Sequence, residues 1–67
     1  MKILVSGSAG QVGSSLAEYL MRDHQVVGVD LRVPDWEAVR DLTVKGDVRE
    51  QGHMKKLMKG VDVVVHA

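Results

Sequence analysis

Residues 5–16 read VSGSAGQVGSSL, and an apolar pair at residues 3–4 stands directly before them. Three glycines, Gly7, Gly10 and Gly13, give this stretch the spacing G-x-x-G-x-x-G. Glycine permits tight turns and lets the backbone approach a ligand closely. A helix that opens in such a loop points unpaired N–H groups and a partial positive charge at a bound phosphate. The stretch therefore predicts a strand, a phosphate-binding loop and a helix in direct succession.

Hydrophobic periodicity predicts alternating strands and helices along the rest of the chain. Short apolar runs bounded by glycine are typical of strands buried on both faces of a parallel sheet. Apolar residues three and four positions apart are typical of one face of a helix. We expect strands at 2–6, 25–31, 42–46 and 61–66, a helix from residue 11 to residue 22 or 23, a helical turn at 35–41 and a helix closing near residue 60.

Each of the two expected helices has an apolar face. In the first helix, Val12, Leu16 and Leu20 recur every four residues. In the second, the apolar face comprises Met54, Leu57, Met58 and Val61, and the solvent face comprises Lys55, Lys56 and Lys59. Asp47, just before this helix, is expected to be its N-cap, a role that does not exclude contact between its carboxylate and a ligand.

The alternation of strands and helices predicts an α/β fold with a parallel sheet and right-handed crossovers. The expected strand order is 3-2-1-4, which is the first half of a doubly wound fold. Its switch point lies between the first and fourth strands, where the glycine loop emerges. Ligands of such folds bind in the crevice at that point.

Composition limits the classes of protein and partner. A chain of 67 residues is one small domain or part of one, and it has no cysteine for disulfides or thiolate metal sites. Nine basic and nine acidic residues balance, so no net charge favours nucleic acid or an anionic membrane. No apolar run approaches the roughly 20 residues that span a bilayer. We expect a cytoplasmic protein.

Two further residues stand at the expected carboxyl ends of strands, Asp30 and His66. Asp30 can accept hydrogen bonds from both adenosine ribose hydroxyls and would repel a 2′-phosphate, although Arg32 nearby could receive one. His66 has no second ligand at metal-binding spacing, so we expect neither a metal site nor a catalytic base there.

Together these features resemble the N-terminal part of the extended short-chain dehydrogenases/reductases, the NAD-dependent epimerase/dehydratase family. That family has T-G-x-x-G-x-x-G, an acidic residue after the second strand, G-D-hydrophobic after the third and V-x-H-x-A-A after the fourth. The matching stretches here begin at Ser6, Asp30, Gly46 and Val64, with serine in place of threonine.

The resemblance implies a partial Rossmann fold that binds NAD, with NADP less favoured. It assigns the pyrophosphate to Gly7, Gly10, Gln11, Val12 and Gly13, the ribose to Asp30 and Leu31, the adenine to Asp47 and Val48, and the crevice wall to Ala67. It also implies an oxidoreductase that acts on a nucleotide-sugar or a similar small substrate.

The chain departs from the family in what it lacks. Family enzymes are much longer and use a Tyr-x-x-x-Lys pair, whereas Tyr19 is followed four residues later by Asp23. We therefore interpret residues 1–67 as the N-terminal half of a dinucleotide-binding domain, without catalytic or substrate-binding parts and inactive alone. The alternatives are a non-catalytic dinucleotide-sensing module and a fragment that binds nothing. We also expect self-association along the fourth strand, because an apolar edge recruits other chains.

Overall fold

The computed structural model describes residues 1–67 and contains one parallel sheet with the strand order β3-β2-β1-β4. This arrangement confirms the α/β class and the predicted order 3-2-1-4. The strands are β1 (Lys2–Ser6), β2 (Gln25–Asp30), β3 (Thr43–Lys45) and β4 (Val63–His66). The helices are α1 (Gln11–Leu20), α2 (Glu37–Arg40) and α3 (Gln51–Leu57).

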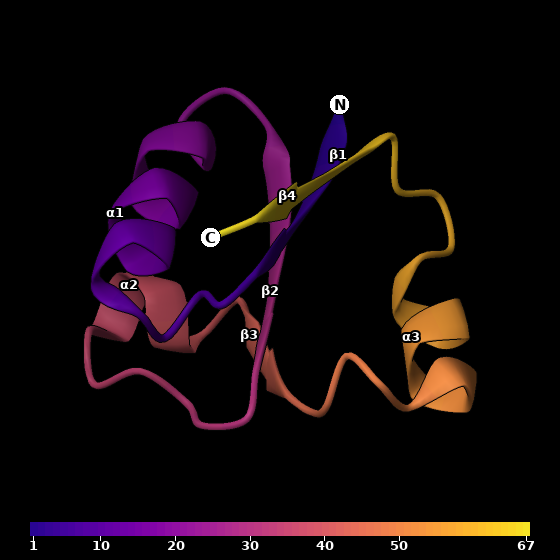
Figure 1. The fold of residues 1–67 in the computed structure, drawn as a ribbon. Helices are drawn as coiled ribbons and strands as arrows, with labels where there is room; N and C mark the ends of the chain where they lie inside the picture. The colour runs from indigo at the N-terminus through magenta and orange to yellow at the C-terminus, as the bar shows by residue number, and fades with distance from the viewer.

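The helices are divided between the two faces of the sheet. Figure 1 shows α1 and α2 together on one side of the strands and α3 standing apart on the other. Each connection from one strand to its parallel neighbour crosses over the sheet, as a parallel pair requires. All four strands therefore end at the same edge of the sheet, where the glycine loop begins.

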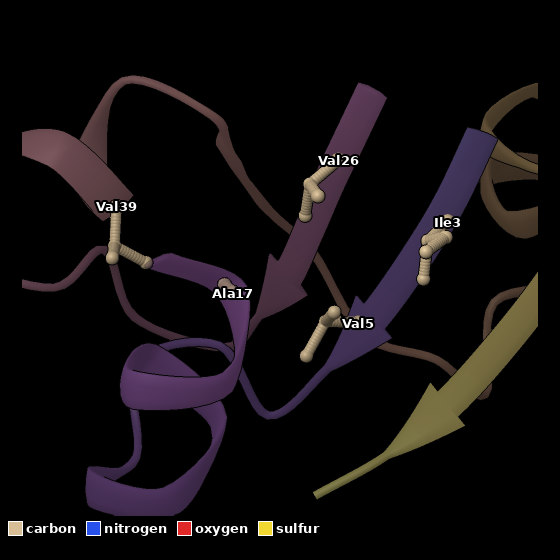
Figure 2. Packing of buried hydrophobic residues seen from close by; sticks show 5 residues of the cluster. All are labelled: Ile3, Val5, Ala17, Val26 and Val39. Atoms are coloured by element: carbon tan, nitrogen blue, oxygen red, sulfur yellow. The ribbon is translucent and has the colours of Figure 1, made fainter. Parts of the chain in front are cut away.

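The hydrophobic core lies between the sheet and the α1–α2 face. Ile3 and Val5 on β1 and Val26 on β2 point toward Ala17 of α1 and Val39 of α2 (Figure 2). Successive strand residues alternate between faces, so Ile3 and Val5 share this face while Leu4, also fully buried, points to the other. Burial of both faces of β1 explains why its three central residues are all apolar.

The first helix is shorter than its periodicity predicts. It ends at Leu20, and not at residue 22 or 23, because residues 21–23 form a turn in which the N–H groups of Asp23 and His24 donate to the Leu20 carbonyl. Val12 is 72% exposed, so its place on the buried helix face is also a wrong prediction. The buried residues of α1 are Gly13 and Ala17.

The last third of the chain is less buried than expected. No residue of α3 is buried, and Met58, which follows it, is 39% exposed. Strand β4 lies at the edge, as the predicted strand order requires, but it is less buried than its apolar sequence predicts, with Val63 and Val64 39% and 40% exposed. The reason is that β4 pairs only with β1, so its second side and much of its faces remain open.

Three strands are also shorter than predicted. Strand β2 ends at Asp30, so Leu31 begins the loop, and β3 covers only Thr43–Lys45 of the expected 42–46. Strand β4 begins at Val63 because Asp62, the residue before it, caps the neighbouring strand: its carboxylate accepts from the Lys2 N–H at 2.8 Å.

Candidate functional site

The glycine loop is fastened to the strand ends on both sides. The Gly7 N–H donates to the Val29 carbonyl of β2 at 2.9 Å, and the Gly10 N–H donates to the Gly7 carbonyl at 3.0 Å. Gly7 has φ +79°, a conformation that L side chains rarely adopt, and a Cβ there would lie 2.7 Å from the Ala67 carbonyl oxygen. Position 7 therefore requires glycine for two reasons, its positive φ and the close approach of Ala67 after β4.

The third glycine lets α1 approach that loop. A Cβ on Gly13 would overlap the Gly7 carbonyl oxygen and lie 2.7 Å from the Gly7 carbonyl carbon. The same atom would lie 3.2 Å from the Ala67 Cβ. Gly7, Gly13 and Ala67 thus form one close contact between the loop, the helix and the end of β4.

The first turn of α1 is open for an anion. Gly10 is the N-cap and provides no side-chain hydrogen bond, and the first N–H with a partner is that of Ser14, which donates to the Gly10 carbonyl at 2.9 Å. The N–H groups of Gln11, Val12 and Gly13 have no acceptor within the protein. The first turn contains no acidic residue, so its partial positive charge is uncompensated.

The Asp30 carboxylate is joined to the glycine loop. Its Oδ2 accepts from the Ala9 N–H at 2.9 Å, and its Oδ1 accepts from the Arg32 N–H at 3.3 Å. The Arg32 guanidinium donates to the Ala9 carbonyl at 3.2 Å, so both sides of the Ala9 backbone are held from the end of β2. A carboxylate has about four lone-pair sites, which leaves Asp30 able to accept two further hydrogen bonds.

Ser8 is a loop residue that sequence reasoning missed. It is fully buried, and its Oγ lies 3.0 Å from Thr43 Oγ1 at the start of β3. Because the Thr43 hydroxyl donates to the Val39 carbonyl at 2.7 Å, Ser8 is the donor of the first bond. This chain of hydroxyls fixes the loop over β2 and β3. No local signal reveals it, since the two residues are 35 positions apart.

Asp47 is not the N-cap of α3 that the sequence predicts, but pairs with Arg49. The N-cap of α3 is Glu50, and the Asp47 carboxylate accepts from the Arg49 N–H at 2.9 Å and from the Arg49 side chain in a bidentate pair at 2.6–3.0 Å. Hydrogen bonding and charge from Arg49 lower the pKa of Asp47 to about 2. The carboxylate therefore stays ionised and oriented above that pH.

Leu31 and Val48, the residues predicted to contact the ribose and the adenine, both lie at the carboxyl ends of the strands. The Gly46 N–H donates to the Asp30 carbonyl at 2.8 Å, which places the loop after β3 beside the loop after β2. Leu31 is 64% and Val48 44% exposed, so both side chains offer apolar surface. His53, also missed from the sequence, packs its ring against Gly46 and supports this loop from α3, with Nδ1 2.6 Å from where a Gly46 Cβ would stand.

The end of β4 lies against the other side of the glycine loop. The Ala67 N–H donates to the Ser6 carbonyl at 3.0 Å, and the His66 ring is paired with Ser6. Seven of the predicted site residues lie in the glycine loop, in the start of α1 or directly beside them: Gly7, Gly10, Gln11, Val12, Gly13, Asp30 and Ala67. The other three, Leu31, Asp47 and Val48, lie farther toward β3 at the carboxyl ends of the strands.

One surface feature lies apart from this edge. A shallow cavity of about 530 Å³ is lined by Gly52, Lys55, Lys56, Met58 and Lys59 on and just after α3. None of the predicted site residues lines it. The candidate site is defined instead by the unpaired N–H groups at the start of α1 and the Asp30 carboxylate, since such groups can hold a ligand without enclosing it. Separately, none of the helices is long and apolar enough to cross a membrane.

Comparisons with known proteins agree with this geometry. The chain is similar to an uncharacterized UDP-glucose epimerase, YtcB, of Bacillus subtilis (strain 168), with 34% identity over 80 aligned positions. It is also similar to the crystal structure of L-threonine dehydrogenase from Phytophthora infestans, with 30% identity and a TM-score of 0.80. Both matches cover 98% of this chain but only 25% and 22% of those proteins, so the chain spans about a quarter of their length.

A match to a family model assigns this chain to a protein family. The model of the NAD dependent epimerase/dehydratase family matches residues 3–67, which is almost the whole chain. This family and the dehydrogenase neighbour imply a nicotinamide dinucleotide as cofactor and confirm the Rossmann-type architecture. The chain belongs to the NAD dependent epimerase/dehydratase family.

Proposed function

We propose that residues 1–67 form the N-terminal half of a dinucleotide-binding domain and hold the adenosine and pyrophosphate part of NAD. The observation that carries the proposal is the open first turn of α1, with three unpaired N–H groups, beside a carboxylate joined to the same loop. Helix N-termini of this kind bind phosphate groups, because unpaired donors and the helix dipole act together.

Each part of the ligand has matching chemistry along the edge. The Gly7–Gly13 loop presents backbone donors to the pyrophosphate, and Asp30, with Leu31 beside it, retains acceptors for the two ribose hydroxyls. Asp47 could accept from the adenine amino group only by giving up one of its four hydrogen bonds from Arg49, while Val48 provides an apolar contact to the ring. Ala67 forms the wall beside the loop. When bound, the cofactor supplies hydride-transfer chemistry that no side chain possesses.

The same geometry favours NAD over NADP. The Asp30 carboxylate suits two free hydroxyls and repels the 2′-phosphate that NADP carries. Arg32, the nearby cation that could receive a phosphate, already donates to the Ala9 carbonyl at 3.2 Å. To bind the 2′-phosphate, Arg32 would have to break its hydrogen bond to Ala9, and the Asp30 carboxylate would still repel the phosphate.

For a longer protein that contains residues 1–67, we propose an oxidoreductase that acts on a nucleotide-sugar. Family membership supports the reaction class, and the similarity to a protein named as a UDP-glucose epimerase supports the substrate class. Residues 1–67 contain no Tyr-x-x-x-Lys pair, so we expect no turnover by this chain alone.

Calorimetric titration of the chain with NAD and NADP tests the proposal. We expect NAD to bind more tightly than NADP, and Asp30→Asn to reduce that preference by about tenfold, since hydrogen bonds to a charged group contribute about 1.5–3 kcal/mol. The matched control is Asp23→Asn, an exposed acid in the turn after α1 at the opposite edge. Equal or tighter binding of NADP by the unmodified chain would contradict the proposal, and the absence of any binding would favour a fragment without function.

A further inference from the structure

The carboxyl ends of β1 and β4 meet in a polar pair directly before the glycine loop. Ser6 and His66 are register partners in the sheet, and Nδ1 of His66 is hydrogen-bonded to Ser6 Oγ. Ser6 is only 5% exposed, so its hydroxyl depends on partners within the protein. Its other contact, with the Val65 carbonyl, is 3.4 Å long and correspondingly weak.

This pair positions Ala67, the residue that lies against the glycine loop. Ala67 follows His66, and its N–H donates to the Ser6 carbonyl at 3.0 Å. On its other side Ala67 touches the loop so closely that a Cβ on Gly7 would lie 2.7 Å from its carbonyl oxygen. The position of Ala67 is therefore set by two bonds to Ser6, one direct and one through His66.

We propose that His66 is a positioning residue of the dinucleotide site, which acts through Ser6 to hold Ala67 against Gly7 and Gly13. The His66 ring is exposed, and its Nε2 has no partner within the protein. The role of His66 is neither catalytic nor metal-binding. The inference rests on the proposed NAD site for its effect on affinity, whereas the contact itself exists without cofactor.

A double-mutant cycle with Ser6→Ala and His66→Leu tests the inference on two readouts, NAD affinity and amide exchange of Ala67 in the cofactor-free chain. We expect each single variant to weaken NAD binding about three- to tenfold, the range for one lost hydrogen bond, and to accelerate Ala67 exchange. The double variant should be no weaker than the single variants, because both remove the same bond.

Two further variants separate positioning from general damage. His66→Asn, whose Oδ1 can replace Nδ1, should restore affinity and exchange toward those of the unmodified chain. The control His24→Leu makes a similar change at a histidine whose Nδ1 has no partner, and it should leave both readouts unchanged. Additive losses in the double variant, or unchanged Ala67 exchange in both single variants, would overturn the inference.

The two proposals fail in different ways. If the unmodified chain does not bind NAD, the proposed function fails, and the Ala67 exchange pattern still decides whether His66 positions the loop. If His66→Leu does not fold, a second measurement takes its place: the imidazole ¹⁵N shifts of His66 are compared between the unmodified chain and Ser6→Ala. A changed Nδ1 shift supports the pairing, and an unchanged shift overturns it.

Discussion

Arg49 holds the carboxylate of Asp47 with both its backbone N–H and its guanidinium, at distances of 2.6–3.0 Å. The two residues are only two positions apart, so the contact is local to the loop after β3. The Asp47 side chain is 23% exposed, whereas that of Arg49 is 83% exposed. An exposed arginine thus orients a largely covered carboxylate at the edge where we place the adenine.

The first prediction concerns the titration of Asp47. Pairing with Arg49 lowers the pKa of Asp47 from 3.8 to about 2. The stabilisation from this pair is therefore complete above pH 3.8 and is lost as the pH falls through about 2. A ¹³C NMR titration should show the carboxylate still ionised at pH 3, and Arg49→Gln should return its midpoint toward 3.8. The same change at Lys55, which forms no ion pair, should leave the midpoint where it was.

The second prediction compares two glycines in helices. Gly13→Ala should destabilise the protein by about 2 kcal/mol or more, because the new methyl group meets the backbone of Gly7 and cannot be accommodated by a rotamer change. Gly52→Ala, where no atom lies within 4 Å of the added Cβ, should stabilise it by about 0.5–1 kcal/mol. Urea unfolding measures both. A tolerated Gly13→Ala would show that α1 can move away from the loop.

The third prediction tests whether the short helix α2 belongs to the core. Val39 is fully buried and packs in one cluster with Ala17 and Val5. Val39→Ala should cost about 1.5–3 kcal/mol of unfolding free energy, from the lost methyl burial and the cavity that remains. Val12→Ala removes the same atoms from a residue that is 72% exposed and should change stability by less than about 0.5 kcal/mol. Similar losses at both positions would mean that α2 is not docked.

The fourth prediction concerns the open edge of the sheet. Val63 and Val64 on β4 are 39% and 40% exposed, and unpaired backbone groups lie beside them. We predict that the chain self-associates along β4, and that Val64→Lys shifts it toward monomer because a charge on an edge strand opposes pairing. Light scattering over a concentration series measures the mass. Val33→Lys, at a loop residue 41% exposed, is the matched control. A constant monomer mass for the unmodified chain would show that the edge does not pair.

Short-range patterns were sufficient for the order of elements. The near-continuous apolar run at residues 2–6, with Ile3, Leu4 and Val5 at its centre, predicts a strand buried on both faces, and β1 is buried on both. The glycine spacing correctly placed the turn between β1 and α1, because φ at Gly7 and the approach of Gly13 to Gly7 are demands of local geometry. The strand order followed from connection rules that depend on chain handedness rather than on particular side chains.

Burial in the last third of the chain did not follow from periodicity. The apolar spacing of Met54, Leu57 and Met58 predicts a helix, and α3 forms. Whether a helix face is covered depends on what packs against it, and here no residue of α3 is buried. The same reasoning explains β4: its valines predict a buried strand, and the connection rules place it at an edge, but how far its faces are covered depends on what packs against them.

The sequence by itself determined the α/β class, the strand order and which residues stand at the strand ends, where we propose that the cofactor binds. Only the tertiary structure decided how those residues are held: Asp30 by Ala9, Ser8 by Thr43, and His66 by Ser6. The physical reason is the range of the interactions. Helix and strand patterns depend on neighbours within a few positions, whereas these three hydrogen bonds join residues 21, 35 and 60 positions apart, which only the packed sheet brings together.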